Sequence, residues 1–363
     1  MSSPLDDRFS RHASLPGWNQ ERLRQATVVI MGLGALGNTV AQCLALAGIG
    51  KLVLCDPDRI EASNLSRTPL FRERDIGRLK VEAAARALAD LAPSVTVDPR
   101  PHRLEAGVGL AELRDAALTL GCLDSRAARL ELAGRCGLVR APWIDGATGS
   151  WSGELRLYLD PQGPCYGCGQ TDEARAASDD PRSCGVPATG LPAGATAPLS
   201  ATIGAHMALL AVRFVMGLSV PAGLLVFDAL QGELARVHQP RDPTCPYHQP
   251  IPGAVPVPIG PQHRVRELLV ALGPDRAPLA WNPIQLRAVC RRCGWNDPKS
   301  RALPATAVPC PRCPAPLRAR TTLEFSHCTP DVRLRDLGIP ARETLAVRTA
   351  TGIDFAELAG YGE

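Results

Sequence analysis

Aromatic side chains are scarce in this sequence. They make up only 4% of its 363 residues, so Ala, Leu and Val must supply most of the core. The sequence also lacks an apolar run of about 18 residues, and we therefore expect no membrane span. Residues 1–25 contain no apolar segment of the signal-peptide type, so we expect a cytoplasmic protein. These absences favour a globular chain, long enough for two or three domains.

The charge of the sequence is modest. A formal net charge of +4 is distributed without long runs of one sign, which argues against nucleic acid as the main partner. Hydrophobic residues make up 45% of the chain, which excludes a wholly disordered protein.

The thirteen cysteines cannot all pair, and without a secretory signal we expect no disulfide framework. Cys290/Cys293 and Cys310/Cys313 are two Cys-x-x-Cys pairs with 16 residues between them. Two thiolates at this spacing reach one tetrahedral ion from a tight turn, and a second pair completes its four ligands. The sequence therefore predicts a zinc ribbon in this segment.

A second set of metal ligands is more widely spread. Cys165 and Cys168 have the same spacing, and Cys245 and His248 form a Cys-x-x-His half-site about 76 residues further on. Spacing alone leaves open whether these two pairs share one ion.

Six cysteines remain. Four lie in apolar patterns and are expected to be small buried side chains: Cys43, Cys55, Cys122 and Cys136. Cys184 and Cys328 lie in polar, irregular sequence. A reactive thiol must be accessible and near positive charge, and Arg182 and His327 lie close to these two cysteines. Either thiol is therefore a candidate nucleophile.

Residues 27–158 alternate short apolar runs with helical patterns, which is typical of a doubly wound, mostly parallel α/β sheet of the Rossmann type. Residues 154–159, 224–229 and 233–237 predict added antiparallel strands. Residues 169–198, rich in Gly, Pro, Ser and Asp, predict a long mobile loop. Eight prolines over residues 240–261 predict a linker.

A glycine-rich loop follows the first apolar run. Gly32, Gly34 and Gly37 lead into a helical pattern, and Asp56 ends the next apolar run. Glycines let the backbone approach a phosphate, and a helix N-terminus offers unpaired N–H groups. The acid is placed to hold ribose hydroxyls. The pattern predicts a nucleotide site, with tight strand–helix packing and no ligand as the alternative.

Charged residues after this loop favour a triphosphate. Asp58, Arg67, Lys80 and Asp124 follow, and each alone could be ordinary surface charge. A dehydrogenase has no use for two cations at the glycine loop. In contrast, cations neutralise the charge that develops as pyrophosphate leaves ATP, and an acid holds Mg²⁺.

Together these elements resemble the ubiquitin-activating-enzyme superfamily, in particular its bacterial homodimeric adenylyltransferases of the ThiF, MoeB and HesA type. The resemblance covers about residues 8–248. It begins at Arg8-Phe-Ser-Arg11-His12 and continues through the glycine loop, Asp56-Pro-Asp58, Ser63-Asn64-Leu-Ser-Arg67, Lys80 and Asp124 to the two metal half-sites. His12, Thr68 and Ser125 replace amide side chains that are usual in the family, and His248 replaces a usual fourth cysteine.

The resemblance implies roles for the matching residues. The nucleotide would contact Gly32, Gly34, Ala35, Gly37, Asp56, Asp58, Ser63, Asn64, Arg67, Lys80, Asp124 and Ser125. Asp124 would bind Mg²⁺, and Arg11 would reach the phosphates of the other subunit, which implies a homodimer. Cys165, Cys168, Cys245 and His248 would bind Zn²⁺, making two Zn²⁺ per chain with the ribbon. Cys184 would be the acceptor of a thioester and, with Arg67, Lys80, Asp124 and Arg11, would be catalytic.

We therefore expect an adenylation domain over residues 1–250, a linker and connecting segment over 251–285, the zinc ribbon over 286–325 and a tail over 326–363. The expected reaction joins the C-terminal glycine of a small ubiquitin-like protein to AMP. The protein then passes to Cys184 and onward to a conjugating enzyme.

Several alternatives stay open. The carrier could be a sulfur-carrier protein of thiamine or molybdopterin-type cofactor biosynthesis, or the substrate could be a small molecule or a tRNA base. Two alternatives outside the adenylyltransferases are a non-catalytic nucleotide-binding scaffold and a dehydrogenase.

Overall fold

The computed structural model describes residues 8–171, 173, 196–304 and 308–360. The chain divides into two compact units. Unit 1 comprises residues 1–104 and 113–250, and unit 2 comprises residues 105–112 and 251–363.

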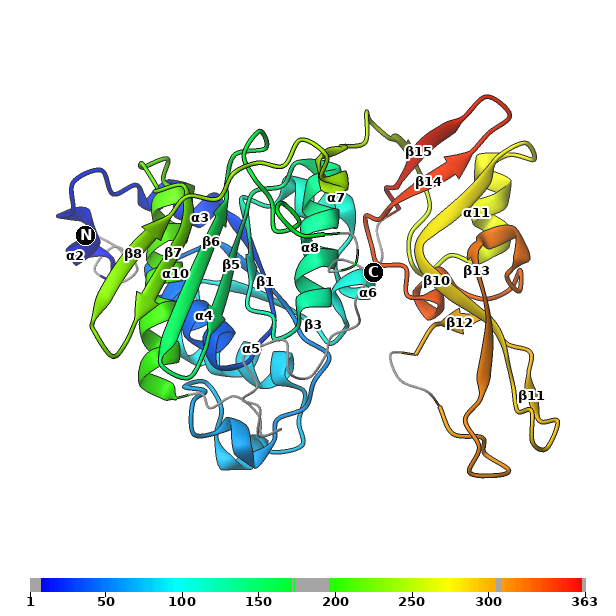
Figure 1. Ribbon diagram of the computed structural model, residues 1–363, viewed down its shortest axis with the longest axis horizontal. Helices are drawn as coiled ribbons and strands as arrows, with labels where there is room; N and C mark the ends of the chain where they lie inside the picture. Colours follow the sequence, from blue (N-terminus) through cyan, green and yellow to red (C-terminus); the bar gives the residue numbers. More distant parts are fainter. Residues whose placement is uncertain (1–7, 172, 174–195, 305–307, 361–363) are drawn as a thin grey trace. The chain divides into compact units, whose positions relative to one another are not determined.

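Unit 1 is built on an eight-stranded sheet of order β3-β2-β1-β4-β5-β6-β7-β8 (Figure 1). Neighbouring strands from β3 to β5 are parallel, and those from β5 to β8 are antiparallel. The predicted α/β fold with added antiparallel strands is confirmed. The strands are β1 (Thr27–Met31), β2 (Lys51–Cys55), β3 (Thr96–Arg100), β4 (Leu118–Gly121), β5 (Trp143–Thr148), β6 (Ser152–Tyr158), β7 (Gly223–Asp228) and β8 (Glu233–Val237).

Helices connect these strands, and residues 105–112, in α6 and α7, belong to unit 2. In α5, Val81, Ala84 and Leu88 are buried at the three- and four-residue spacing of an amphipathic helix. Gly48, with φ of 81°, ends α4 in the left-handed conformation that glycine tolerates. Along the chain up to residue 248 the helices are α2 (Ser10–Ala13), α3 (Gln20–Gln25), α4 (Ala35–Ala47), η1 (Ala62–Asn64), η2 (Glu73–Asp75), α5 (Lys80–Leu91), α6 (Leu104–Gly107), α7 (Leu110–Asp115), α8 (Arg126–Val139), α10 (Ala197–Val215) and η3 (Pro246–His248).

One helix differs from the expectation of no membrane-length apolar segment. Among the described residues, α10 is long and apolar enough to cross a membrane by length and composition, and half of it is buried. It packs against α4, β5 and β6. A core helix of a globular domain passes the same test.

Unit 2 has a sheet of order β11-β10-β14-β15-β9, with β12 and β13 also paired to β10. Phe325, Leu334 and Leu345 are fully buried in its core. The elements are β9 (Val255–Val257), α11 (Val265–Leu272), β10 (Ala277–Val289), β11 (Asn296–Asp297), β12 (Arg301–Ala302), β13 (Arg318–Glu324), η4 (Phe325–His327), η5 (Leu334–Leu337), β14 (Thr344–Arg348) and β15 (Ile353–Leu358).

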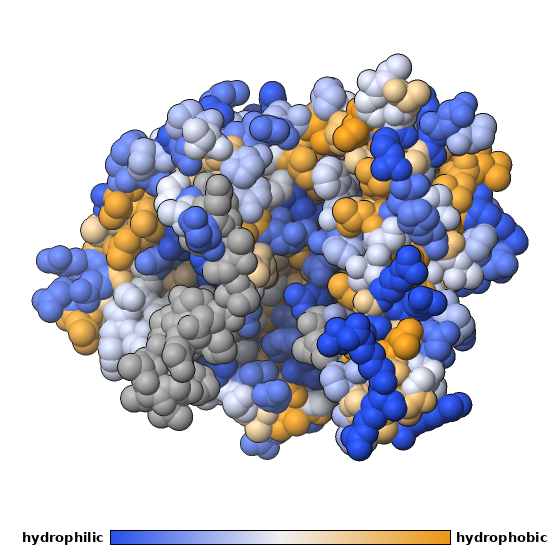
Figure 2. Space-filling model, turned by 45° about the vertical axis from the view of Figure 1, so that its right-hand side comes forward, coloured by the Kyte–Doolittle hydropathy of each residue, from blue (hydrophilic) through white to orange (hydrophobic). Residues whose placement is uncertain are grey.

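Unit 2 joins segments that the sequence analysis divides at residues 285 and 325. β10 runs through the first of these divisions, and β14 and β15 come from the expected tail. The residues expected to form a linker and connecting segment include β9, α11 and most of β10. On the face drawn in Figure 2, hydrophobic residues (orange) lie in separate patches among hydrophilic ones (blue).

Candidate functional site

The candidate nucleotide site lies at the carboxyl ends of β1, β2 and β4. β1 lies between β2 and β4 in the sheet, so the chain crosses to opposite sides of β1. In open α/β sheets, this topological switch point is where ligands bind. The glycine loop follows β1, Asp56 follows β2 and Asp124 follows β4, so the structure brings three predicted segments to one edge.

The three loop glycines meet different constraints. Gly32 has φ of 93°, and a Cβ there would lie 2.3 Å from the carbonyl oxygen of Cys122. A Cβ on Gly37 would lie 1.9 Å from the carbonyl oxygen of Gly32, so only glycine allows this turn to close against α4. In contrast, a Cβ on Gly34 would meet no described atom within 4 Å. The loop is therefore tight toward the protein and open at Gly34, just before Ala35 begins α4.

Asp56 orders the loop from the neighbouring strand. Its carboxylate accepts hydrogen bonds from the backbone N–H groups of Leu33, at 2.6 Å, and Asp58, at 2.8 Å. Burial raises the pKa of Asp56, while the ammonium of Lys80 and the two N–H groups lower it by less.

Lys80 is the first residue of α5, and its side chain is only 12% exposed. Its Nζ lies 2.8 Å from Oδ2 of Asp58 and 4.0 Å from Oδ2 of Asp56. The predicted cation and both predicted acids are therefore in one cluster beside the glycine loop.

Ser63, Asn64 and Arg67 lie on or next to the short helix η1. The Asn64 side chain accepts a hydrogen bond from the Glu61 N–H at 3.1 Å, and so caps this helix. The half-buried Arg67 side chain donates to the carbonyl of Ser63 at 2.6 Å. Among the described residues, no hydrogen bond or ion pair joins Arg67 to the Lys80 cluster.

Asn38 is a residue that the sequence analysis missed. It is fully buried in α4, donates to the Leu33 carbonyl at 2.7 Å and accepts from the Leu70 N–H at 3.1 Å. It thereby ties the glycine loop to the chain that follows Arg67. An asparagine in an apolar helical pattern was the only signal in the sequence.

Asp124 is exposed, and its carboxylate has no hydrogen bond or ion pair within the described part of the chain. Ser125 caps α8 by accepting from the Ala128 N–H at 3.2 Å. Arg129, also missed by sequence analysis, donates to the Leu123 carbonyl at 2.5 Å and to the buried Asp145 at 3.1 Å. Within the described residues, Asp124 is therefore an unpaired acid, on a segment that Arg129 ties to Leu123 and Asp145.

Arg11 belongs to the N-terminal segment, which packs at the ends of α4 and α5 that are far from the candidate nucleotide site. Phe9 lies against Gly48 at the end of α4, and Arg8 donates to the carbonyl of Leu91 at the end of α5. A helix of 13 residues is about 20 Å long. The structure therefore does not bring Arg11 to the glycine loop of its own chain.

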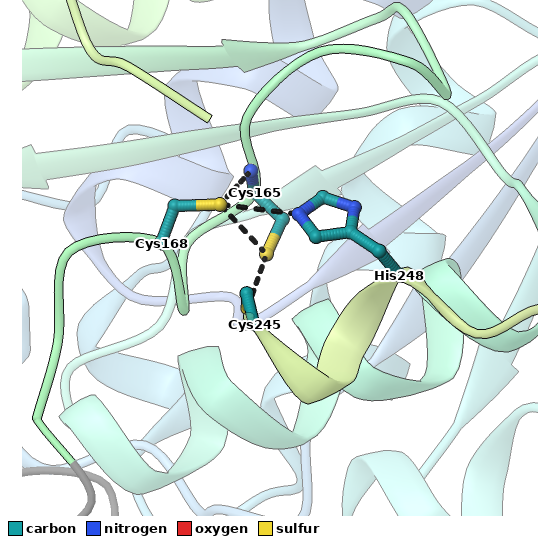
Figure 3. Close-up of side chains that lie close together, drawn as sticks. All are labelled: Cys165, Cys168, Cys245 and His248. Carbon is teal, nitrogen blue, oxygen red and sulfur yellow. Dashed lines mark hydrogen bonds between the residues drawn. The ribbon is translucent and has the colours of Figure 1, made fainter. Parts of the chain in front are cut away.

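The first predicted set of metal ligands is assembled in unit 1 (Figure 3). The sulfur of Cys165 lies 3.8 Å from that of Cys168 and 3.6 Å from that of Cys245, and Nε2 of His248 lies 3.1 Å from the sulfur of Cys168. Zn–S bonds of about 2.3 Å place sulfur ligands about 3.8 Å apart, so this donor set fits tetrahedral Zn²⁺. Burial, with Arg241 nearby, lowers the pKa of His248 and favours the neutral ring that a metal requires.

The second set is assembled at the end of the ribbon in unit 2. The sulfurs of Cys290 and Cys313 are 3.5 Å apart, as are those of Cys293 and Cys310. All four ligand atoms lie within 4.8 Å of one another. Four thiols in this arrangement also suit Zn²⁺.

The two candidate acceptor thiols differ. Cys184 lies outside the described residues, as does most of the segment 169–198. Cys328 is buried, and burial raises its pKa to about 11. A buried, protonated thiol is a poor nucleophile. The four cysteines expected to be structural are buried or half-buried: Cys43, Cys55, Cys122 and Cys136.

Comparisons with known proteins agree with this geometry. The ThiF family model matches residues 9–247. Molybdopterin-synthase adenylyltransferase of Escherichia coli K12 is 31% identical over 244 residues, which are 66% of this chain and 94% of that protein. Sulfur carrier protein adenylyltransferase of Thermus thermophilus is 33% identical over 250 residues, covering 66% of this chain and 89% of that protein.

Solved structures extend the likeness to the fold. A crystal structure of E. coli MccB superposes with a TM-score of 0.57 and 22% identity, covering 68% of this chain and 74% of that one. At this identity the likeness concerns the fold alone, and it agrees with the sheet of unit 1.

Proposed function

Because this chain belongs to the ThiF family, we propose that it adenylates the C-terminal carboxylate of a small sulfur-carrier protein with ATP. The observation that carries the proposal is the convergence of the open glycine loop, Asp56, Lys80 and Asp124 at one sheet edge. Two relatives are named as adenylyltransferases of molybdopterin synthase and of a sulfur carrier protein, which favours a sulfur carrier over a conjugated modifier as the substrate.

In the proposed reaction, a carboxylate oxygen of the carrier attacks the α-phosphorus of ATP. The bond from that phosphorus to the bridging oxygen of the β-phosphate breaks, and pyrophosphate leaves with the electron pair. The products are an acyl-adenylate and pyrophosphate. Lys80 would neutralise charge that develops on the phosphates, and Arg67 would join it after leaving the Ser63 carbonyl.

The remaining residues would hold the nucleotide. The carboxylate of Asp56 would accept hydrogen bonds from the ribose hydroxyls. The backbone N–H groups at the start of α4 would face the phosphates near Gly34. The exposed carboxylate of Asp124 is suited to hold Mg²⁺, which would supply further positive charge to the phosphates. Each of the two cysteine-rich clusters would hold one structural Zn²⁺.

A homodimer is part of the proposal. The edge strand β8 is exposed along its whole length and carries Leu234 and Val237, with Leu230 in the turn before it. Trp151 lies beside this turn, since the Ala229 N–H donates to its carbonyl, and is 58% exposed. An open sheet edge with exposed apolar side chains favours pairing with a second copy. The distance of Arg11 from its own loop also supports a role in a partner's site.

Thioester formation on Cys184 is the second candidate function. Each of the twelve described cysteines lies in a metal cluster or is buried or half-buried, so a thioester would fall on Cys184. Free thiols throughout the described part of the chain also suit a reducing compartment, and we infer a cytoplasmic location.

The test is exchange of labelled pyrophosphate into ATP by the purified chain, with small proteins ending in glycine from the same genome as candidate carriers. We expect exchange only with a carrier, and a loss of at least about 100-fold in Asp124→Ala. Asp90→Ala, an exposed acid near the far end of α5, is the matched control and should keep full activity.

Full exchange in Asp124→Ala would contradict the site assignment. The second function is tested in the same mixtures. A reducing-agent-sensitive adduct that disappears in Cys184→Ala would establish the thioester, whereas a carrier adenylate without an adduct leaves the sulfur-carrier proposal in place.

A further inference from the structure

The ribbon carries positive charge that the proposed adenylation does not use. Residues 286–324 contain eight arginine and lysine residues against two carboxylates, a formal charge of +6. The whole chain carries only +4, so its other residues are net negative. A Zn²⁺ ion with four thiolates has a charge of −2, which leaves the ribbon positive even with metal bound.

Strand register places part of this charge on one face. β10 pairs with β13 on one side, where Arg287 is opposite Arg320 and Val289 is opposite Arg318. Residues directly opposite each other in neighbouring strands point to the same face of the sheet. We call Arg287, Arg318 and Arg320 the arginine face. The nearby acid Asp297 is opposite Ala288 and therefore lies on the other face.

The three side chains of the arginine face are exposed and, within the residues that the structure describes, have no hydrogen bond or ion pair. Arg287 and Arg320 face each other across the strands with Cβ atoms about 5 Å apart, an arrangement of like charges that destabilises a sheet. Three exposed arginines elsewhere in unit 2 are paired instead: Arg266 with Asp331 at 2.5 Å, Arg276 with Asp354 at 3.8 Å and Arg335 with Asp336 at 3.8 Å.

The charge and composition of the arginine face indicate which kind of partner it can bind. The centres of protein interfaces are more apolar than the rest of the surface. On this face, the apolar residues that the β10–β13 pairing describes are Val289, which is half-buried opposite Arg318, and Ile284, which is buried opposite Thr322. One guanidinium group can donate two parallel hydrogen bonds to two oxygens of a phosphate. Arg318 and Arg320 are two residues apart on an extended strand, about 7 Å, so their charges form a row.

The same charge continues to the metal end of the ribbon. Arg291, Arg292 and Arg312 are exposed beside the cysteine ligands, and their side chains likewise have no partner among the described residues. We propose that the arginine face binds the phosphate backbone of a nucleic acid.

The test uses fluorescence anisotropy with a labelled RNA stem-loop and a DNA hairpin of the same sequence, which distinguish the two sources of phosphate. The full chain carries the triple change Arg287→Ala, Arg318→Ala and Arg320→Ala. We expect at least about 10-fold weaker binding, and a slope of log affinity against log salt that is smaller by about 3. The matched control changes Arg266, Arg276 and Arg335 to Ala, which removes the same charge from ion-paired positions of unit 2.

Zinc content checks that the ribbon of the triple variant is intact. A second variant with lysine at the same three positions keeps the charge and should keep the salt slope. Pyrophosphate exchange is a separate readout, which should be unchanged in all three variants, so failure of this proposal and failure of the proposed function are distinguishable.

The proposal is overturned if the wild-type chain binds neither probe or if both alanine triples lose affinity equally. It is also overturned if the first triple loses binding of an acidic carrier protein while nucleic-acid binding is unchanged. That last result would assign the arginine face to a protein partner.

Discussion

At the scale of single residues, Lys80 stands where local preference disfavours it. A positive charge on the first residue of a helix opposes the helix dipole. Asp56 and Asp58 offset this by lying within 4.0 Å and 2.8 Å of its ammonium group. A lysine held in an unfavourable position by two acids, next to an open glycine loop, is better explained by a ligand phosphate than by stability.

The buried carboxylate of Asp56 predicts a pH dependence of stability. Burial raises its pKa in the folded protein, so folding favours the protonated form. The contribution of Asp56 to stability is therefore greatest below the unfolded pKa of about 3.9 and falls as pH rises through the folded pKa. Asp56→Asn cannot ionise. Urea unfolding across this pH range should show the wild type losing stability relative to the variant as pH rises, and a constant difference would contradict the assignment.

Asn38 predicts a stability effect at the same site. Asn38→Ala leaves the Leu33 carbonyl and the Leu70 N–H without their buried partner, and we expect a loss of about 1–3 kcal/mol in the free energy of unfolding. Thr39→Val is the matched control, because the Thr39 hydroxyl bonds only to its own helix at Ala35 and the change preserves shape. Equal losses in urea unfolding would show that Asn38 has no special role.

At the scale of elements, the first candidate zinc cluster joins two distant segments. Cys165 and Cys168 follow β6, Cys245 and His248 follow β8, and Tyr247 between the latter two packs on the glycines Gly134 and Gly137 of α8. A metal bound here would close a loop of about 80 residues, so its free energy of binding would contribute directly to folding.

Removing one ligand from each cluster should therefore have unequal effects. Cys165→Ser should lower the zinc content from two ions per chain to one and lower the stability of unit 1 by several kcal/mol, since structural zinc contributes on the order of 10 kcal/mol in small peptides. Cys290→Ser should also remove one ion but leave pyrophosphate exchange unchanged. Elemental analysis of the wild type giving fewer than two ions, or loss of exchange in Cys290→Ser, would contradict the separation of the two roles.

Features set by residues close together in the sequence could be predicted, whereas features that depend on residues far apart in the sequence could not. The glycine loop, Asp56 and the cysteine pairs are local patterns, and each element formed where its residues indicated. Asn38 and Arg129 could not be identified because their partners, Leu70 and Asp145, are brought near only by the fold.

The Pro-rich segment shows the same limit. β9 contains Pro256, and proline is tolerated in a sheet only at an edge. β9 is an edge strand, paired with β15 from about 100 residues later. A strand whose only partner is at the other end of unit 2 cannot be distinguished from a linker by composition.

At the scale of the whole molecule, the position of Arg11 predicts how the active unit is composed. Phe9, two residues before it, lies against Gly48 at the end of α4, a helix about 20 Å long that starts at the glycine loop, and within the described residues the Arg11 side chain has no partner. If Arg11 serves the partner's site in a symmetric dimer, Arg11→Ala and Asp124→Ala each inactivate homodimers by different routes. Mixing them then creates hybrids in which one site lacks both residues and the other has both. Because half of randomly exchanged dimers are hybrids with one intact site, pyrophosphate exchange should return to about a quarter of the wild-type rate.

Mixing each variant with itself is the control. No recovery, once labelled subunits have been seen to exchange, would place Arg11 outside the partner's site and remove the main reason for a shared active site.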